Sequence, residues 1–119
     1  MPNETAEVVS IQNAAHYQWG DNCDGWHLVQ SDALSIIQER MPPGASETRY
    51  YHQRSRQFFF ILSGEAALDM QGERKVLKAQ QGIEVPPGVA HQMHNPSETE
   101  LVFVVVSTPK SHGDRVEVP

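Results

Sequence analysis

Two histidines in short strand-like segments are the side chains of this sequence best suited to chemistry. His52 shares its segment with Tyr50, Gln57 follows shortly after, and His91 comes just after a Pro-Pro-Gly turn. Residues two apart on a strand point to the same face, so Tyr50 and His52 are expected to share one. Imidazole nitrogens suit zinc, iron, nickel and copper, and the amide oxygen of Gln57 can add a ligand. The pattern therefore predicts a divalent transition-metal site, provided that the fold brings the segments together.

The spacing of these residues resembles the two sequence motifs of the cupin superfamily. The first motif covers about residues 44–64 and the second about residues 80–95. The positions that match are Gly44, His52, Gly64, Pro86, Gly88, His91 and Asn95. Two positions depart from the family pattern, because Tyr50 stands where a histidine is expected and Gln57 where a glutamate is expected.

This resemblance implies an all-β fold, a double-stranded β-helix or jelly-roll β-barrel, with the site inside the barrel. Carried over to this sequence, His52, Gln57 and His91 are the metal ligands. Tyr50 is the candidate catalytic residue, as a proton donor to a substrate, or else a further metal ligand through its phenol oxygen. The metal is expected to be Fe, Zn, Ni or Mn. Gln57 is neutral, whereas the usual glutamate offsets the charge of the metal, so weaker metal binding is expected than in the usual set.

Each of these residues also has a purely structural interpretation. His52 and His91 could form a site without metal, Gln57 could be a buried amide satisfied by hydrogen bonds, and Tyr50 could be a packed aromatic residue. The remaining histidines, which lie off the motif positions, are interpreted as surface or packing residues: His16, His27, His94 and His112.

The resemblance leaves two functions open. The first is a small metal-dependent enzyme that acts on a polar small molecule, of the dioxygenase, isomerase or lyase type. The second is a non-catalytic small-molecule binding or sensor protein with a degenerate metal site. A fold does not choose between these functions, and the missing histidine and glutamate favour the second more than a complete ligand set would.

Short apolar segments separated by turn residues predict strands throughout and no helix of useful length. The predicted strands cover residues 8–12, 26–29, 34–41, 48–52, 57–62, 65–70, 75–78, 83–85, 90–95, 101–107 and 116–118. Ser63-Gly64 and Gln71-Gly72 are expected to form tight hairpin turns, because glycine tolerates positive φ. Residues 1–7 are expected to be disordered, and the 119 residues to form one domain.

Composition limits the class of protein. The single cysteine cannot form an internal disulfide, and together with a polar, acidic N-terminus it favours a cytoplasmic protein. No apolar run is long enough for a transmembrane helix. The formal net charge of -6, without a block of Lys or Arg, argues against nucleic acid and anionic membranes as partners.

Two predicted strands, residues 57–62 and 101–107, are apolar on both faces. A barrel wall that faces water on one side should alternate apolar and polar residues, so something must cover the outer face. The opposing sheet or the N-terminal strands could cover it, and so could a second copy of the chain; the two explanations are not exclusive. A homodimer is expected.

Overall fold

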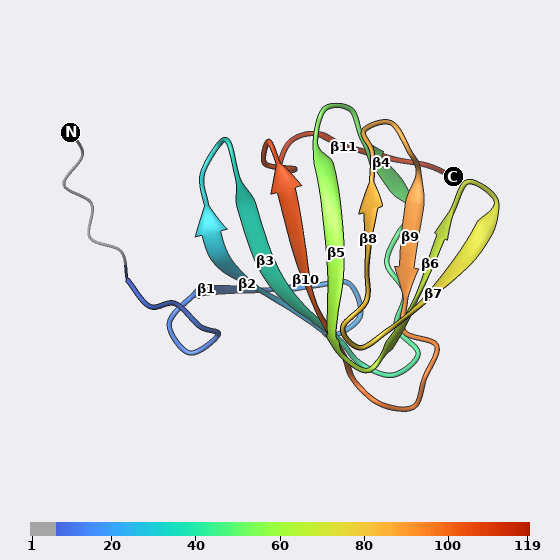
Figure 1. The fold of residues 1–119 in the computed structure, drawn as a ribbon, viewed down its shortest axis with the longest axis horizontal. Coiled ribbons are helices and arrows are strands. Elements are labelled where there is room, and N and C mark those ends of the chain that lie inside the picture. Colours follow the sequence, from blue (N-terminus) through green and yellow to red (C-terminus); the bar gives the residue numbers. More distant parts are fainter. Residues whose placement is uncertain (1–6) are drawn as a thin grey trace.

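The computed structural model describes residues 7–119, so the disorder expected for residues 1–7 falls almost wholly on a segment outside the described part. Residues 7–119 form eleven β-strands and no helix, and hence contain no helix that could cross a membrane. The strands form two antiparallel sheets that face each other (Figure 1). The all-β double-stranded β-helix predicted from the sequence is therefore confirmed.

The larger sheet has six strands in the order β1-β2-β3-β10-β5-β8. Its strands are β1 (Ala15–Trp19), β2 (Cys23–Gln30), β3 (Ser35–Met41), β10 (Leu101–Thr108), β5 (Arg56–Ser63) and β8 (Gly82–Val85). β10 lies between β3 and β5, although it is far from both in sequence. The last long strand thus joins the N-terminal half of the sheet to the first motif.

The smaller sheet has five strands in the order β11-β4-β9-β6-β7. Its strands are β11 (Arg115–Glu117), β4 (Tyr50–His52), β9 (His91–His94), β6 (Glu65–Met70) and β7 (Glu73–Lys78). β4 comes from the first motif and β9 from the second, and they pair through Tyr50 and His91. This pairing places the two motifs next to each other at one end of the barrel.

The predicted hairpin turns are present and need their glycines. Gln71 and Gly72 have φ of 54° and 75° between β6 and β7, the positive values that a tight two-residue hairpin requires. Gly64 has φ of 86°, and a Cβ atom there would lie 2.5 Å from the carbonyl oxygen of Glu100. A side chain at position 64 would therefore clash with backbone as well as strain its own.

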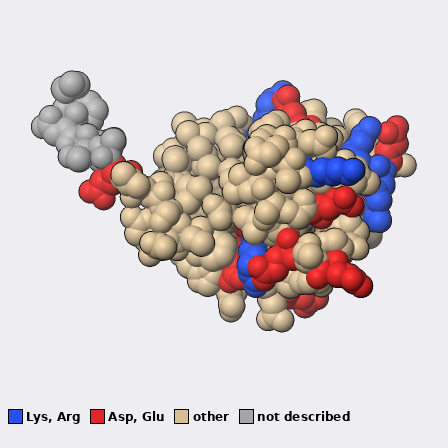
Figure 2. All heavy atoms as spheres, turned by 60° about the horizontal axis from the view of Figure 1, so that its bottom comes forward, with Lys and Arg blue, Asp and Glu red and all other residues tan. Residues whose placement is uncertain are grey.

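The core lies between the sheets, where alternate residues of each strand point inward. The largest side chains that are almost fully buried are Phe59, Phe103, Met41, Ile61, Leu68, Met93 and Leu101. Phe59 of this core reaches the ring of His91, with 5.7 Å between ring centroids, and polar side chains of β3, β4 and β5 occupy one end of the space between the sheets. In Figure 2, most of the charged side chains lie over the right and lower parts of the molecule.

The N-terminal region differs from its prediction. Residues 8–12 are not a strand, whereas Ala15–Trp19, where no strand is predicted, forms β1. β1 is an edge strand that pairs along its whole length with β2. Its residues are mostly exposed, so the sequence lacks the apolar alternation that would have indicated a strand.

The outer face of the six-stranded sheet stays partly uncovered. β1 continues the sheet at its edge and does not fold over it. On β5, Phe58 is 41% exposed and Leu62 is 36% exposed. Of the two explanations for the doubly apolar strands, covering by the N-terminal strands is therefore wrong.

Candidate functional site

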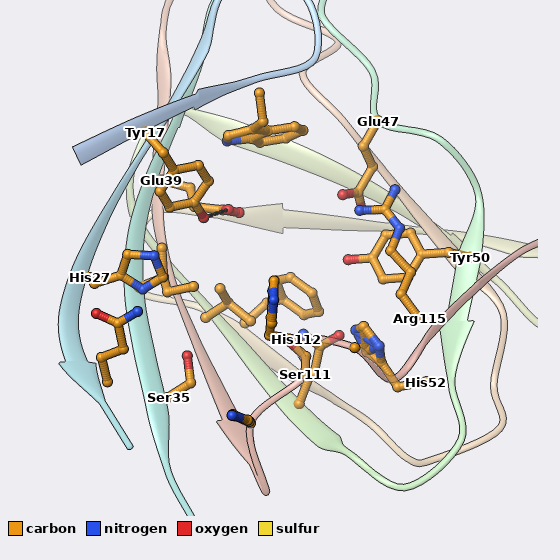
Figure 3. Close-up of a pocket in the computed structure, with 18 of the residues that line it drawn as sticks. Tyr17, His27, Ser35, Glu39, Glu47, Tyr50, His52, Ser111, His112 and Arg115 are labelled. Carbon is orange, nitrogen blue, oxygen red and sulfur yellow. Dashed lines mark hydrogen bonds between the residues drawn. The ribbon is translucent and has the colours of Figure 1, made fainter. Parts of the chain in front are cut away.

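A cavity of about 540 Å³ opens between the two sheets at the polar end of the barrel. One wall carries Glu47, Tyr50, His52 and Arg115, and the facing wall carries Tyr17, His27, Ser35 and Glu39 (Figure 3). Four apolar side chains also line it, those of Trp19, Ile37, Phe59 and Val105, together with further polar residues such as Gln57, Lys110 and His112. A cavity that combines apolar surface with convergent polar groups is the usual form of a small-molecule site.

Three of the four sequence-predicted site residues meet as a cluster of rings. The ring centroid of Tyr50 lies 5.0 Å from that of His52 and 4.6 Å from that of His91, and the two imidazole centroids are 6.2 Å apart. Gln57, on β5 of the other sheet, lines the cavity with Tyr50 and His52, whereas His91 is not among the residues that line it. The four residues thus come from β4, β5 and β9, and all four are almost fully buried.

The polar atoms of this group lack partners. Both ring nitrogens of His52, Oε1 of Gln57 and Nε2 of His91 are buried without a hydrogen bond from the protein. Buried polar atoms in native proteins are nearly always paired, and leaving one unpaired costs about 1–3 kcal/mol. Such a concentration of unpaired atoms indicates a site for a bound group.

Two hydrogen bonds orient these side chains. Nδ1 of His91 lies 3.0 Å from the carbonyl oxygen of Val89 and donates to it, which leaves Nε2 as a bare acceptor. Nε2 of Gln57 donates to Oγ of Ser107 at 3.1 Å, so the amide oxygen of Gln57 is the free atom. A hydrogen bond of this kind to a histidine fixes its tautomer and typically accompanies metal ligation.

Burial keeps both imidazoles neutral. It lowers the pKa of His52, and it lowers the pKa of His91 to about 4, against an ordinary value of 6.5. The loss of hydration disfavours the charged form in each case. Two neutral imidazoles therefore present lone pairs at neutral pH.

The surroundings of Tyr50 affect the protonation of its phenol. The guanidinium of Arg115 lies 4.0 Å above the centre of its ring. Burial, and then the nearby carboxyl of Glu47, raise the pKa of Tyr50 well above its ordinary value of 10. The phenol consequently stays protonated at neutral pH, as a proton donor must.

Sequence reasoning missed two carboxyl groups of the cavity. Burial raises the pKa of Glu39 to about 7, and burial together with the charge of Glu39 raises that of Glu47 to about 8. Oε1 of Glu47 accepts a hydrogen bond from the backbone N–H of Met93 at 2.9 Å. The sequence predicts a strand over residues 34–41 but gives no sign that Glu39 faces a cavity, and nothing in it indicates Glu47.

The other histidines divide into two pairs. His27 and His112, expected at the surface or in packing, line the cavity. His94 is a structural residue on the far face of β9, where Nε2 contacts Asp69 at 2.8 Å and Nδ1 contacts Ser46 at 2.6 Å. His16 contacts Asp24 at 2.7 Å in the same way. Spacing relative to the motifs does not separate these two kinds of histidine.

Comparison with known families identifies the chain. A family model described as a cupin domain matches residues 37–107, which include both motifs. The chain belongs to the cupin family. The match covers β3 to β10, so the strands that carry His52, Gln57 and His91 lie within it. Tyr17 and His27 of the facing wall, and Arg115, lie outside it.

Curated relatives of this cupin differ in their names. It is 30% identical over 69 residues to a Streptomyces cyaneus protein named polyketide synthase CurC, and 34% identical over 90 residues to an uncharacterized protein of Streptomyces coelicolor. It is 26% identical over 85 residues to an oxalate-binding protein of Thermotoga maritima. The matches cover 58%, 74% and 67% of this chain, and 45%, 85% and 70% of those proteins, respectively. A match to a Salmonella mannose-1-phosphate guanylyltransferase covers 18% of that protein, so several relatives are much longer than the region they share.

Solved structures agree on the fold. A predicted oxalate decarboxylase of Thermotoga maritima superposes with a TM-score of 0.80 at 21% identity, over 87% of this chain and all of that one. Streptomyces PAC13 with uridine superposes with a TM-score of 0.80 at 15% identity, over 97% of this chain and 92% of that one. Identities this low establish the shared fold alone.

Proposed function

We propose that this cupin binds a divalent transition metal through His52, Gln57 and His91 and acts on a polar small molecule in the cavity. The observation that carries the proposal is the set of unpaired buried atoms on these three side chains. They consist of imidazole nitrogens and an amide oxygen, all of which bind such metals. In residues 7–119, no three His, Cys, Asp or Glu side chains are grouped for metal binding, so the amide of Gln57 is needed to complete the set.

The donor chemistry fits such a metal. His91 has one nitrogen occupied by a backbone carbonyl and the other free, and Gln57 has its NH₂ occupied and its oxygen free. Because both imidazoles are neutral, they need not release a proton to bind a cation. The set carries no negative charge, so the affinity is expected to be lower than for a set that includes a carboxylate.

The side chains around the three proposed ligands would have different roles in a reaction. When bound, the metal would polarise an oxygen of the substrate as a Lewis acid. Tyr50 holds a proton beside His52 and His91, and Arg115 stacked on its ring attracts an anionic group. The apolar surface of Phe59 and Val105 excludes water from the reacting atoms. This arrangement suits dioxygenase, isomerase or lyase chemistry on a polar substrate.

A binding or sensor function is the second candidate. The neutral ligand set and the absence of the family glutamate favour it, because a weakly held metal would serve as an anchor for a ligand as readily as for catalysis. In this alternative, Tyr50 and the carboxyls would hold the ligand by hydrogen bonds. The name of the Thermotoga relative makes oxalate the first ligand to test.

Calorimetric titration with Zn²⁺, Mn²⁺, Ni²⁺ and anaerobic Fe²⁺ tests the proposal. The wild type is expected to bind one of them at one ion per chain, and His52→Ala and His91→Ala to weaken binding by roughly 100-fold or more. His94→Ala is the matched control, because it removes an equally ordered histidine that is already paired. Equal affinity in the wild type and His52→Ala would contradict the proposal.

We also propose that two copies of the chain associate through the outer face of the six-stranded sheet. Apolar side chains gather there on neighbouring strands: Phe58, Phe60 and Leu62 on β5, and Val102, Val104 and Val106 on β10. A large exposed apolar patch commonly marks an interface. A two-fold axis would bring the same patch together from both copies without leaving an open end.

The oligomeric state tests this association. Light scattering during size-exclusion chromatography is expected to give the mass of a dimer for the wild type and of a monomer for Phe58→Lys. Val76→Lys is a control at an exposed apolar position on the other sheet. A monomeric wild type would contradict the proposal.

A further inference from the structure

Tyr17 and Glu39 form a hydrogen-bonded pair that spans three strands of the cavity wall. The hydroxyl of Tyr17, on β1, donates to Oε2 of Glu39, on β3, at 3.1 Å. Gly25 of β2 lies between them, opposite Tyr17 on one side and opposite Glu39 on the other. The Tyr17 side chain therefore crosses a whole strand to reach its partner (Figure 3).

Gly25 makes this crossing possible. A Cβ atom at position 25 would lie 2.3 Å from Cζ and 2.5 Å from the hydroxyl oxygen of Tyr17. A Cβ atom does not approach a non-bonded atom this closely, so any larger residue at position 25 would displace the Tyr17 ring. Glycine in the middle of a strand lowers its stability, and here it makes room for a polar pair that faces the cavity.

A third polar side chain lies beside the pair of Tyr17 and Glu39, and a charged side chain lies across the cavity from it. The ring of His27 lies 5.0 Å from that of Tyr17, and its buried Nδ1 has no hydrogen-bond partner. Arg115 stands on the opposite wall with Glu47, and it contacts Glu117 at 4.0 Å (Figure 3). A second cation of the cavity, Lys110, is paired with Asp32 at 2.9 Å. Arg115 is thus the cation that faces Tyr17 and Glu39 across the cavity.

We propose that the carboxyl group of Glu39, oriented by Tyr17, determines specificity by hydrogen-bonding to an uncharged hydroxyl or carbonyl oxygen of the ligand, whose carboxylate faces Arg115. The ligand class is a hydroxy acid or oxo acid. This inference rests on the proposed function, because it assumes that the cavity holds the ligand. It adds a substrate class and a contact wall that lies largely outside the cupin-domain match.

The surroundings of Glu39 move its titration close to neutral pH. Tyr17, Cys23 and His27 face it from β1 and β2, and Glu47 and Arg115 face it across the cavity. Burial raises its pKa to about 7, against the lowering effects of the Tyr17 hydrogen bond and the charge of Arg115. Above that pH the carboxylate can no longer donate a proton and repels an acid anion, so ligand binding should weaken as the pH rises.

Matched acids that differ in their hydroxyl groups test the proposal. Calorimetry with malate against succinate, and gluconate against hexanoate, measures the preference for the oxygenated acid. At about pH 6, where Glu39 is protonated, the wild type is expected to prefer the oxygenated acid by roughly 3- to 10-fold, the contribution of one hydrogen bond. The preference is expected to shrink toward about pH 9 as the carboxyl ionises.

Substitutions assign the preference to this pair. Glu39→Gln keeps a neutral donor, so the preference should persist and lose its pH dependence, whereas Glu39→Met should abolish it. Gly25→Ala displaces Tyr17 and should lower the preference without removing either polar residue. Glu84→Gln, on the outer side of β8, is the matched control and should behave as the wild type.

Two results would overturn the inference. One is a preference that survives Glu39→Met, and the other is wild-type protein that binds none of the four acids at millimolar concentration or binds both members of each pair equally. Metal titration of the same samples keeps the two proposals apart. Metal binding that depends on His52 would leave the proposed function standing even when the acid preference fails.

Discussion

Two buried polar residues, His91 at the start of β9 and Asn95 just after its end, differ in how far their hydrogen-bonding groups are paired. At one end, Asn95 donates from Nδ2 to the carbonyl oxygens of Met41, Pro42 and Thr99, at 3.0, 3.1 and 2.8 Å. Its Oδ1 accepts from both the N–H and the hydroxyl of Ser97. At the other end, His91 keeps one nitrogen unpaired beside two further side chains with unpaired atoms, those of His52 and Gln57.

Asn95 and His91 are equally buried, at 1% exposure each, so burial alone does not distinguish them. The difference lies in hydrogen-bond satisfaction. Asn95 uses its amide to hold together the loops at residues 41–45 and 95–99, a structural role. The unpaired atoms at the His91 end cost stability and are retained, which is typical of a functional site.

The largest expected effect is at the paired end. Asn95→Ala would remove five hydrogen bonds at once. The carbonyl oxygens of Pro42 and Thr99 would keep other donors, so the free energy of unfolding should fall by about 2–4 kcal/mol. Urea denaturation followed by circular dichroism measures the change. A loss below about 0.5 kcal/mol would show that Asn95 is not a structural anchor.

The cavity carboxyls are expected to have an effect of intermediate size, because they make the free energy of unfolding depend on pH. The pKa values of Glu39 and Glu47 rise from 4.5 to about 7 and about 8 on folding, so the folded protein holds protons that the unfolded chain releases. The free energy of unfolding should therefore fall as pH rises from about 4.5 to about 8. Both side chains are only partly buried, and water in the cavity reduces the effect to roughly 2 kcal/mol in total.

Urea denaturation across this pH range checks the prediction. The double variant Glu39→Gln and Glu47→Gln should flatten the curve, since an amide does not titrate. Glu65→Gln, outside the cavity, serves as the control. An unchanged slope in the double variant would assign the pH dependence to other groups.

The smallest change in stability is expected at the unpaired end. In metal-free protein, His52→Leu should change the free energy of unfolding by no more than about 1 kcal/mol, in either direction, because neither ring nitrogen of His52 has a partner to lose. His94→Leu, which breaks two contacts, should cost more. A loss of several kcal/mol in His52→Leu would mean that His52 is a structural residue.

Much of this organisation could be predicted from sequence. The strands from β3 onward follow from apolar alternation and glycine turns, and the positions of His52, Gln57 and His91 follow from motif spacing. β1 could not be predicted, because an exposed edge strand lacks an apolar pattern. The link from Tyr17 to Glu39 depends on the registers of three strands and on the space above Gly25, and a local pattern contains neither.

Metal content tests the central claim, that the unpaired atoms of His52, Gln57 and His91 form a metal site. The measurement is elemental mass spectrometry on protein purified without an affinity tag or chelator. The expected result is close to one Fe, Zn, Ni or Mn ion per chain, lost in His91→Ala and retained in His94→Ala. Metal far below one per chain, and not restored by added ions, would contradict it.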